Sequence, residues 1–338
     1  TVWARMNAVF HGLAERVRRN EAIPLPVAAL LTASTPVVRV GMWLRRRRRI
    51  VHVDANVISV GNLTAGGTGK TPLVVERARQ ELARGRKVAV LTRGYGSAPA
   101  TNPVAADANG PDVPFALMGD EAALLIQKIP GIVVVKCVDR VAAAHAAVER
   151  HGCDTLILDD GFQYVRLARN EDIVVIDARN PFGNGRLIPR GLLREPVEAL
   201  RRATHVVLTR CDQASGLESL GARIRAICPD IPVRTTRHAP AHCRRVGDGK
   251  TFPLDMLREG PIRAACAIGA PEAFFDTLAS LGATVTERLA FPDHAGIPES
   301  ALDGPLPVVV TEKDAVRMRK APDHVFALSV ELEDWPPS

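Results

Sequence analysis

The fold is decided by residues 57–72, which read Val57-Ile58-Ser59-Val60-Gly61-Asn62-Leu63-Thr64-Ala65-Gly66-Gly67-Thr68-Gly69-Lys70-Thr71-Pro72. The short apolar, β-branched run at the start predicts a strand, and residues 73–82 predict a helix. A glycine-rich turn between them lets backbone N–H groups face phosphate oxygens, and the helix dipole adds attraction. The sequence therefore predicts a phosphate-binding loop whose ligands come from Gly66, Gly67, Thr68, Gly69, Lys70 and Thr71.

The side chains of this loop suit a nucleoside triphosphate with Mg²⁺. Lys70 is placed to reach the β- and γ-phosphates, and Thr71 offers a hydroxyl to the metal. Thr64 stands where the strict pattern has glycine, so the loop is a variant. The alternative is a glycine-rich turn that binds nothing, but the Gly-Lys-Thr core between a strand and a helix favours phosphate binding.

A second motif supplies the carboxylate that such a loop needs. Residues 155–161 run from an apolar, β-branched stretch into Asp159, Asp160 and a glycine. A carboxylate at the end of a buried strand next to a phosphate loop holds Mg²⁺ directly or through water. Adjacent side chains of a strand point to opposite faces, so one of the two acids meets the metal directly, and we favour Asp159.

The rest of the chain alternates apolar strands with amphipathic helices. This order predicts an α/β fold of the P-loop NTPase type, with a mostly parallel sheet covered by helices on both faces. Ligands of such sheets gather at the carboxyl ends of the strands, where Arg93, Asp159 and Asp177 are expected. The expected strands are 88–92, 132–135, 173–177, 206–209, 263–268 and 308–311, and the expected helices include 121–128, 141–150 and 273–281.

Three segments are expected along the chain. Residues 1–50 form a basic, amphipathic N-terminal segment, residues 51–235 the nucleotide-binding core, and residues 236–338 a smaller α/β lobe. The boundary is placed where residues 231–253 become rich in Arg, His and Pro, which predicts an irregular linker.

Composition and charge exclude several classes of protein. The chain is 46% hydrophobic, 24% charged and only 4% aromatic, so a base-stacking nucleic-acid platform is disfavoured. Residues 1–50 hold ten Lys/Arg against two acids, which gives this segment a net charge of +8. The whole chain has a net charge of +7, so the remaining residues together carry −1. A nucleic-acid binder would spread its basic charge over the body. The six scattered cysteines predict buried or free thiols and no zinc site.

The N-terminal segment predicts contact with a membrane surface. Trp3, Met6, Phe10, Leu13 and Val17 recur at helical spacing on one face, and five consecutive arginines occupy positions 45–49. Prolines interrupt the second apolar stretch, residues 23–44, so we expect no spanning helix. Apolar residues beside a basic run favour a protein that lies on a bilayer. The alternative is a helix packed on the core with a solvated arginine run.

With these motifs in place, the sequence resembles the tetraacyldisaccharide 4′-kinase family of lipid A biosynthesis. The resemblance runs from about residue 57 to residue 317, with a weaker match in the N-terminal helix. Nine segments in order carry it: 61–72, 92–96, 119–121, 139–140, 159–163, 182–186, 193–196, 291–294 and 311–315. Three positions depart from the family pattern, namely Phe162, Tyr164 and Leu192, and the last is expected to loosen a loop near the substrate.

The resemblance implies an ATP- and Mg²⁺-dependent kinase. Its reaction would transfer the γ-phosphate of ATP to the 4′-hydroxyl of tetraacyldisaccharide 1-phosphate, at the cytoplasmic face of a bacterial inner membrane, as a peripheral or monotopic protein. The expected partners are this lipid and the membrane surface, with no nucleic acid and no obligate protein partner evident.

The resemblance also assigns roles to individual residues. Asp120 matches the position regarded as the catalytic base, although by sequence alone it is most simply a residue at a helix N-terminus. His294 matches a partner of that carboxylate, and Lys70 stabilises the transferring phosphoryl group. The substrate is expected to contact loop residues, for which plain salt bridges are the alternative: Arg93, Tyr95, Asn184, Arg186, Arg194 and Glu195.

Two rival functions are set against the kinase. A P-loop GTPase or metallochaperone-type NTPase would release free phosphate and prefer another nucleotide. A non-enzymatic adaptor would rely on the basic N-terminus alone, which leaves the complete phosphate loop unexplained.

Overall fold

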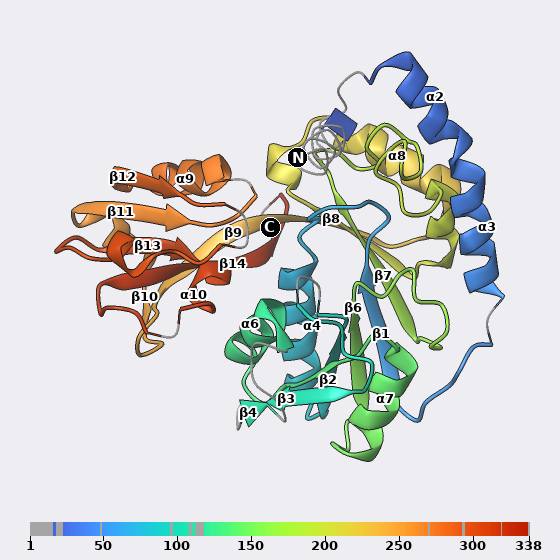
Figure 1. The fold of residues 1–338 in the computed structure, drawn as a ribbon, viewed down its shortest axis with the longest axis horizontal. Coiled ribbons are helices and arrows are strands. Elements are labelled where there is room, and N and C mark those ends of the chain that lie inside the picture. Colours follow the sequence, from blue (N-terminus) through green and yellow to red (C-terminus); the bar gives the residue numbers. More distant parts are fainter. Residues whose placement is uncertain are drawn as a thin grey trace, which may run out of the picture.

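The computed structural model describes residues 16–17, 23–47, 49–94, 97–107, 110–111, 118–269, 271–292, 295–318 and 320–336. Figure 1 shows a larger body that carries the phosphate loop and a smaller lobe formed by the C-terminal strands. The strands form one continuous sheet in the order β12-β11-β13-β14-β9-β8-β7-β1-β6-β2-β5-β3-β4. The same sheet therefore runs through both parts.

The larger body is built on parallel strands around β1. Neighbours β6 and β7 flank β1 in parallel register, β2 and β5 extend the sheet on one side, and β8 extends it on the other. The antiparallel strands β3 and β4 complete the outer edge. The bounds are β1 Asn56–Gly61, β2 Val88–Thr92, β3 Val104–Asp107, β4 Gly110–Pro111, β5 Val133–Lys136, β6 Thr155–Asp159, β7 Glu171–Asp177 and β8 His205–Thr209.

Helices cover both faces of this sheet because its strands are apolar on both sides. Ile58 and Ile157 pack with α4 and α6 on one face, while Val57 and Leu156 pack with α7 on the other. This confirms the predicted fold class. The helices of the larger body are α4 Lys70–Ala83, α6 Asp120–Lys128, α7 Arg140–Glu149 and α8 Leu217–Ile227, with 3₁₀ turns η1 Val197–Arg202 and η2 Cys211–Gln213.

The smaller lobe has a core of its own. Phe275 and Leu278 of its helix pack on Ile262 and Val309 of its strands. Its parallel strands pair in the order β12, β11, β13 and β14. The bounds are β10 Thr251–Phe252, η3 Leu254–Arg258, β11 Pro261–Cys266, α9 Pro271–Ser280, β12 Thr284–Ala290, η4 Glu299–Ala301, β13 Val308–Thr311, α10 Glu312–Ala315 and β14 Val325–Asp334.

The expectation of an irregular linker at residues 231–253 was wrong. Residues Val233–Arg245 form β9, a 13-residue strand that pairs in parallel with β8 at its start and antiparallel with β14 from Thr236 onward. The strand is rich in polar residues, so its sequence lacks the apolar pattern that predicts a strand. Pro240 lies at a shift in register, where its missing N–H is tolerated. The strand joins the larger body to the smaller lobe.

The N-terminal segment also departs from expectation. Residues Leu25–Ala33 form α2 and residues Thr35–Arg46 form α3, and the prolines at positions 26 and 36 do not break them. Each proline is the second residue of its helix, where a missing N–H costs nothing. By length and hydropathy alone, the stretch Leu25–Leu44 is sufficient to cross a membrane, and 6% of it is buried. The apolar stripe predicted at residues 3–17 lies outside the described residues apart from Val17, which is buried.

Candidate active site

The phosphate loop joins β1 to α4 as predicted. Gly66 and Gly69 have left-handed φ values of 115° and 79°, which favour glycine. A Cβ added at Gly66 or Gly67 would meet no atom within 4 Å, so the loop opens toward free space. The buried Thr68 hydroxyl has no hydrogen-bond partner among the described residues. An open, glycine-lined turn with an unused hydroxyl suits a bound phosphate chain.

Residues from neighbouring strands hold the loop from behind. The Thr209 hydroxyl donates to the carbonyl of Thr68 at 2.8 Å, and Arg210 donates to the carbonyl of Gly67 at 3.2 Å. Arg210 also pairs with Asp177 at 2.6 Å. Sequence analysis placed Asp177 at a strand end but missed the role of Arg210, because the contact joins segments 143 residues apart.

His238, on β9, packs against the loop from the side of the smaller lobe. A Cβ at Gly69 would lie 2.3 Å from Cε1 of the His238 ring, so this glycine is required by close approach as well as by its φ. Burial, reinforced by the charge of Arg210, lowers the pKa of His238 to about 4. The imidazole is therefore neutral beside the phosphate loop at physiological pH.

This histidine makes a pH-dependent contribution to stability. Its pKa is about 4 when folded and 6.5 ordinarily, so the unfolded chain binds more protons between these values. Stability is then lost as pH falls from about 6.5 to about 4. The free energy of unfolding can be measured by urea denaturation at pH 7 and at pH 4.5. Between these pH values, that of His238→Gln should fall by about 2 kcal/mol less than that of the wild type. An equal loss in both proteins would contradict the placement of His238 in a buried, cation-facing position.

The acidic pair lies at the carboxyl end of β6, next to the loop. Lys70 Nζ is 3.2 Å from Asp160 Oδ1, and Arg194 Nη1 is 2.7 Å from Asp160 Oδ2. Burial alone would raise the pKa of Asp160, but Lys70 and Arg194 hold it below its usual range. Burial raises the pKa of Asp159, against the attraction of Lys70. The two adjacent acids thus differ in environment, since Asp160 is paired with two cations.

Two further acids come from the start of α6. Asp120 is its first residue and has a side chain 47% exposed. Glu121 follows, and burial, reinforced by the charge of Asp159, raises its pKa to about 7. Sequence analysis quoted Glu121 within a motif but gave it no role. The structure adds it to the group of carboxylates around Lys70.

These carboxylates fit a divalent cation. The raised pKa values of Asp159 and Glu121 indicate a site short of positive charge, which a cation would supply. Among the described residues, no three His, Cys, Asp or Glu side chains already surround one metal position. Mg²⁺ is usually held by one or two carboxylates together with substrate phosphates and water. The set is thus suited to a metal that arrives with the nucleotide.

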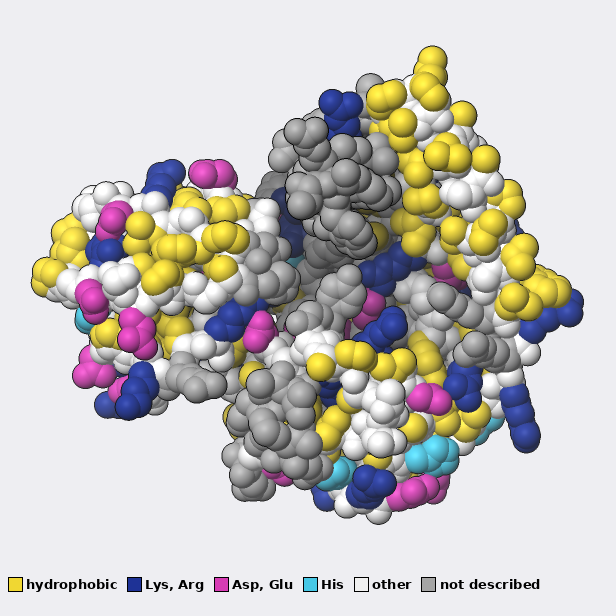
Figure 2. Space-filling view, viewed as in Figure 1, with side chains coloured by type: hydrophobic (Ala, Val, Ile, Leu, Met, Phe, Trp, Pro, Cys, Tyr) yellow, Lys and Arg dark blue, Asp and Glu magenta, His cyan; other side chains and the backbone are white. Residues whose placement is uncertain are grey.

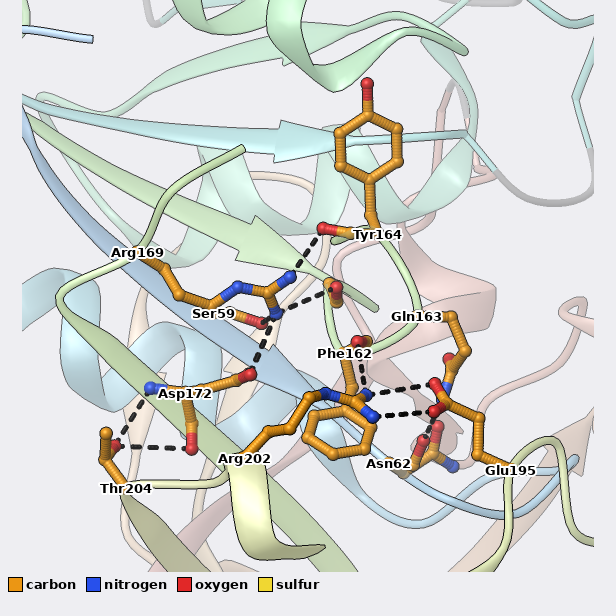
Figure 3. A network of polar contacts seen from close by, with 11 residues as sticks. Ser59, Asn62, Phe162, Gln163, Tyr164, Arg169, Asp172, Glu195, Arg202 and Thr204 are labelled. Carbon is orange, nitrogen blue, oxygen red and sulfur yellow. Dashed lines mark hydrogen bonds and ion pairs between the residues drawn. The ribbon is translucent and has the colours of Figure 1, made fainter. Parts of the chain in front are cut away.

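A network of buried polar contacts supports the turn after the acidic pair. Figure 3 shows Glu195 facing Arg202, whose guanidinium lies over the ring of Phe162. Arg202 donates to both Glu195 oxygens, at 2.8 and 3.1 Å. Arg169 donates to Ser59 at 3.1 Å and to Asp172 at 3.0 Å. Glu195 is 4% exposed, and its carboxylate is paired with Arg202. This is the loop salt bridge that the sequence analysis gave as the alternative to substrate contact.

The loop with residues 182–195 is held against the phosphate loop by its backbone. The N–H of Ala65 donates to Leu192 O at 2.7 Å, and the N–H of Arg194 donates to Leu63 O at 2.7 Å. This pairing explains how Arg194 reaches Asp160. A Cβ at Gly183 would lie 3.1 Å from the Leu192 side chain, so Leu192 packs within the loop.

The remaining predicted substrate residues are placed as follows. Asn184 donates to the carbonyl of Arg190 at 3.0 Å and accepts from the N–H of Arg186 at 3.1 Å, so it shapes its own loop. The side chains of Arg93 and Arg186 are exposed. Tyr95 and His294 lie outside the described residues.

One hollow adjoins this site, and another lies away from it. One of about 420 Å³ lies in the smaller lobe beside Arg317, and Gly296 and Ile297 line it too. Arg317 contacts Asp120, so the loop that follows His294 lies near the start of α6. The larger hollow, about 750 Å³, lies at the amino ends of β1, β6 and β7 and contains none of the predicted site residues. The predicted phosphate loop and acidic pair lie at the opposite, carboxyl ends of β1 and β6.

Comparison with known proteins finds similarity along most of the chain. The family described as tetraacyldisaccharide-1-P 4′-kinase (LpxK) matches residues 22–336. A tetraacyldisaccharide 4′-kinase of Anaeromyxobacter dehalogenans (strain 2CP-C) is 43% identical over 310 residues, which cover 87% of this chain and 82% of that protein. A tetraacyldisaccharide 4′-kinase from Pelobacter propionicus is 35% identical over a match that covers 96% of this chain and 93% of that protein. The crystal structure of the "apo" form of LpxK from Aquifex aeolicus in complex with ATP superposes with a TM-score of 0.74, at 27% identity, over 92% of this chain and 94% of that one.

Proposed function

Because the chain belongs to the tetraacyldisaccharide-1-P 4′-kinase family, we propose that its phosphate loop, its acidic pair and Asp120 form the active site. The chain is a kinase of lipid A biosynthesis that transfers the γ-phosphate of ATP to the 4′-hydroxyl of tetraacyldisaccharide 1-phosphate. The convergence of Lys70, Asp160 and Glu121 at one end of the sheet carries the assignment of the site.

Asp120 is the proposed general base. A sugar hydroxyl is a weak nucleophile, so the site must align it with the γ-phosphate and accept its proton. The half-exposed carboxylate of Asp120 is open to such a hydroxyl, and it stands at the same sheet edge as Lys70. His294 is proposed, on the resemblance alone, to share this proton. The test is whether turnover depends on a proton acceptor at position 120.

Lys70 and Thr71 are proposed to act on the phosphates. The ammonium of Lys70 is held at the loop by Asp160, and from there it would contact the β- and γ-oxygens. Thr71 and Asp159 would hold Mg²⁺, with Asp160 beside them, and the metal would neutralise charge on the phosphate oxygens. Asp159 is preferred over Asp160 because Lys70 and Arg194 already neutralise Asp160.

The lipid substrate is proposed to meet the exposed cations around this edge. Arg93 and Arg186 suit its phosphate and sugar oxygens, and Tyr95 and Asn184 follow on the resemblance. Arg194 contributes by orienting Asp160, and Glu195 by fixing the loop through Arg202.

We further propose that α2 and α3 lie on the cytoplasmic face of the bacterial inner membrane. Figure 2 shows apolar side chains along both helices, and the exposed ones include Leu30, Val37 and Trp43 at 71%, 74% and 50%. Contiguous exposed apolar surface marks a membrane or protein contact. Helix α3 ends at Arg46, and the run of arginines at positions 45–49 of the sequence would add attraction to anionic lipid. Because the lipid substrate is amphipathic, a membrane is favoured over a protein as the partner of this surface.

A vesicle-binding measurement tests this surface. Leu30→Glu should weaken partitioning onto phosphatidylglycerol vesicles by about tenfold or more, because it removes buried apolar area and adds a repelled charge. The matched control is Val138→Glu, which places the same charge on an apolar residue of the larger body that is 37% exposed. Equal partitioning of the two variants in a flotation assay would contradict membrane contact through α2.

A further inference from the structure

The smaller lobe presents two cations to the two acids that begin α6. Arg317 Nε donates to Asp120 Oδ2 at 2.6 Å, across 197 residues of sequence. The charge of Lys313, four positions earlier, opposes the rise in the pKa of Glu121 that burial and Asp159 cause. Both cations come from α10 and the turn that follows it. The motif at residues 311–315 therefore meets the motif at residues 119–121.

Arg317 also lies against a buried acid of its own lobe. Its side chain is 14% exposed, and its Nη1 is 3.6 Å from Asp314 Oδ1. Asp314 is itself buried at 1% exposure. It accepts from the Thr311 hydroxyl at 2.6 Å and from the N–H of Ala267 at 3.2 Å. The guanidinium that meets Asp120 therefore lies beside a buried carboxylate of its own lobe, and two donors hold that carboxylate in place.

Asp120 needs such an orienting group. A carboxylate in the first turn of a helix is attracted to the unpaired N–H groups of its own helix. Gly119 before it supplies no side-chain cap. Arg317 engages Oδ2 and so opposes rotation of the carboxylate toward the helix, while the side chain of Asp120 remains 47% exposed.

We propose that Arg317 is a positioning residue for phosphoryl transfer, a role that rests on Asp120 being the base. Arg317 fixes Oδ2 so that Oδ1 accepts the proton of the sugar hydroxyl. The hydroxyl oxygen then forms its bond to the γ-phosphorus while the bond to the ADP oxygen breaks. Arg317 keeps its own protons throughout. The base is thereby oriented only when the smaller lobe rests against α6.

A simple latch between the lobes is the alternative, and the same interface provides its controls. Lys128 Nζ pairs with Glu312 Oε2 at 2.7 Å, and Arg79 Nη1 pairs with Glu331 Oε1 at 2.8 Å. Both pairs join the larger body to the smaller lobe, and neither includes Asp120. A latch would make these pairs and Arg317 equivalent.

The first test compares Arg317→Gln with Lys128→Gln and Arg79→Gln in steady-state assays of transfer to the lipid. Arg317→Gln should lower kcat about 10- to 100-fold, as for a misplaced catalytic group, with the KM for ATP unchanged within about twofold. Arg317→Lys should restore part of kcat. The two controls should stay within about fivefold of the wild type. An equal decrease in kcat in all three Gln variants would overturn the proposal. So would an Arg317→Gln variant in which only the KM for lipid rises.

The second test repeats Arg317→Gln in an Asp120→Asn background by single-turnover assay. If Arg317 acts through Asp120, the second substitution should add less than about a twofold loss. A full multiplication of the two losses would mean that the residues act independently. If Asp120→Asn itself retains wild-type turnover, the proposed base is wrong, a failure that is distinct from a failure of Arg317.

Discussion

Asp120→Asn is expected to lower kcat by about 10³-fold, the middle of the range for loss of a general base. The amide has the shape of the carboxylate and can still accept a hydrogen bond from Arg317 through its oxygen. It cannot take the proton of the sugar hydroxyl. Because Asp120 lies on α6 and not in the phosphate loop, the affinity for ATP should change little.

The assay is initial-rate transfer to the lipid, with nucleotide affinity measured separately by calorimetry. Asp276→Asn, on an exposed position of α9, is the matched control and should behave as wild type. If Asp120→Asn keeps turnover within about tenfold of the wild type, another group accepts the proton.

Lys70→Met is expected to lower kcat/KM by about 10³-fold, because one preorganised cation is lost from the transferring phosphoryl group. Methionine retains much of the length of lysine but brings no charge. The loss of Lys70 also leaves Asp160 with Arg194 as its ion-pair partner among the described residues. Both the phosphates and the acidic pair are therefore affected.

Lys87→Met, an exposed lysine after α4, removes the same charge away from the loop and should leave kcat/KM unchanged. Thermal unfolding of both variants separates folding from catalysis. A Lys70→Met enzyme that folds normally and keeps kcat/KM within about tenfold would exclude Lys70 from the reaction.

The sequence predicted the larger body well because its signals are local. Residues 57–72 contain a strand, a glycine turn and a helix start within one short stretch, and the acidic pair directly follows an apolar strand. The expected helix at residues 121–128 and the observed α6, Asp120–Lys128, differ by one residue for the same reason. In the smaller lobe, strand β13 was also predicted at its observed bounds, Val308–Thr311.

Most of the misses arise because the signals are not local, and one arises from a misread local signal. Strand β9 is polar along its length and is stabilised by pairing with β14, some 100 residues away. The prolines of α2 and α3 were read as helix breakers, although their position within the first turn makes them compatible with a helix. The contacts of Arg210, His238 and Arg317 with the site depend on how distant segments pack.

The most direct test of the account uses the purified wild-type protein with γ-labelled ATP, Mg²⁺ and tetraacyldisaccharide 1-phosphate in detergent micelles. Thin-layer chromatography then follows the label. We predict that the label moves to the lipid and that the transfer requires the lipid acceptor. Label released only as inorganic phosphate, with the lipid unlabelled, would contradict the account and would favour a nucleotide hydrolase.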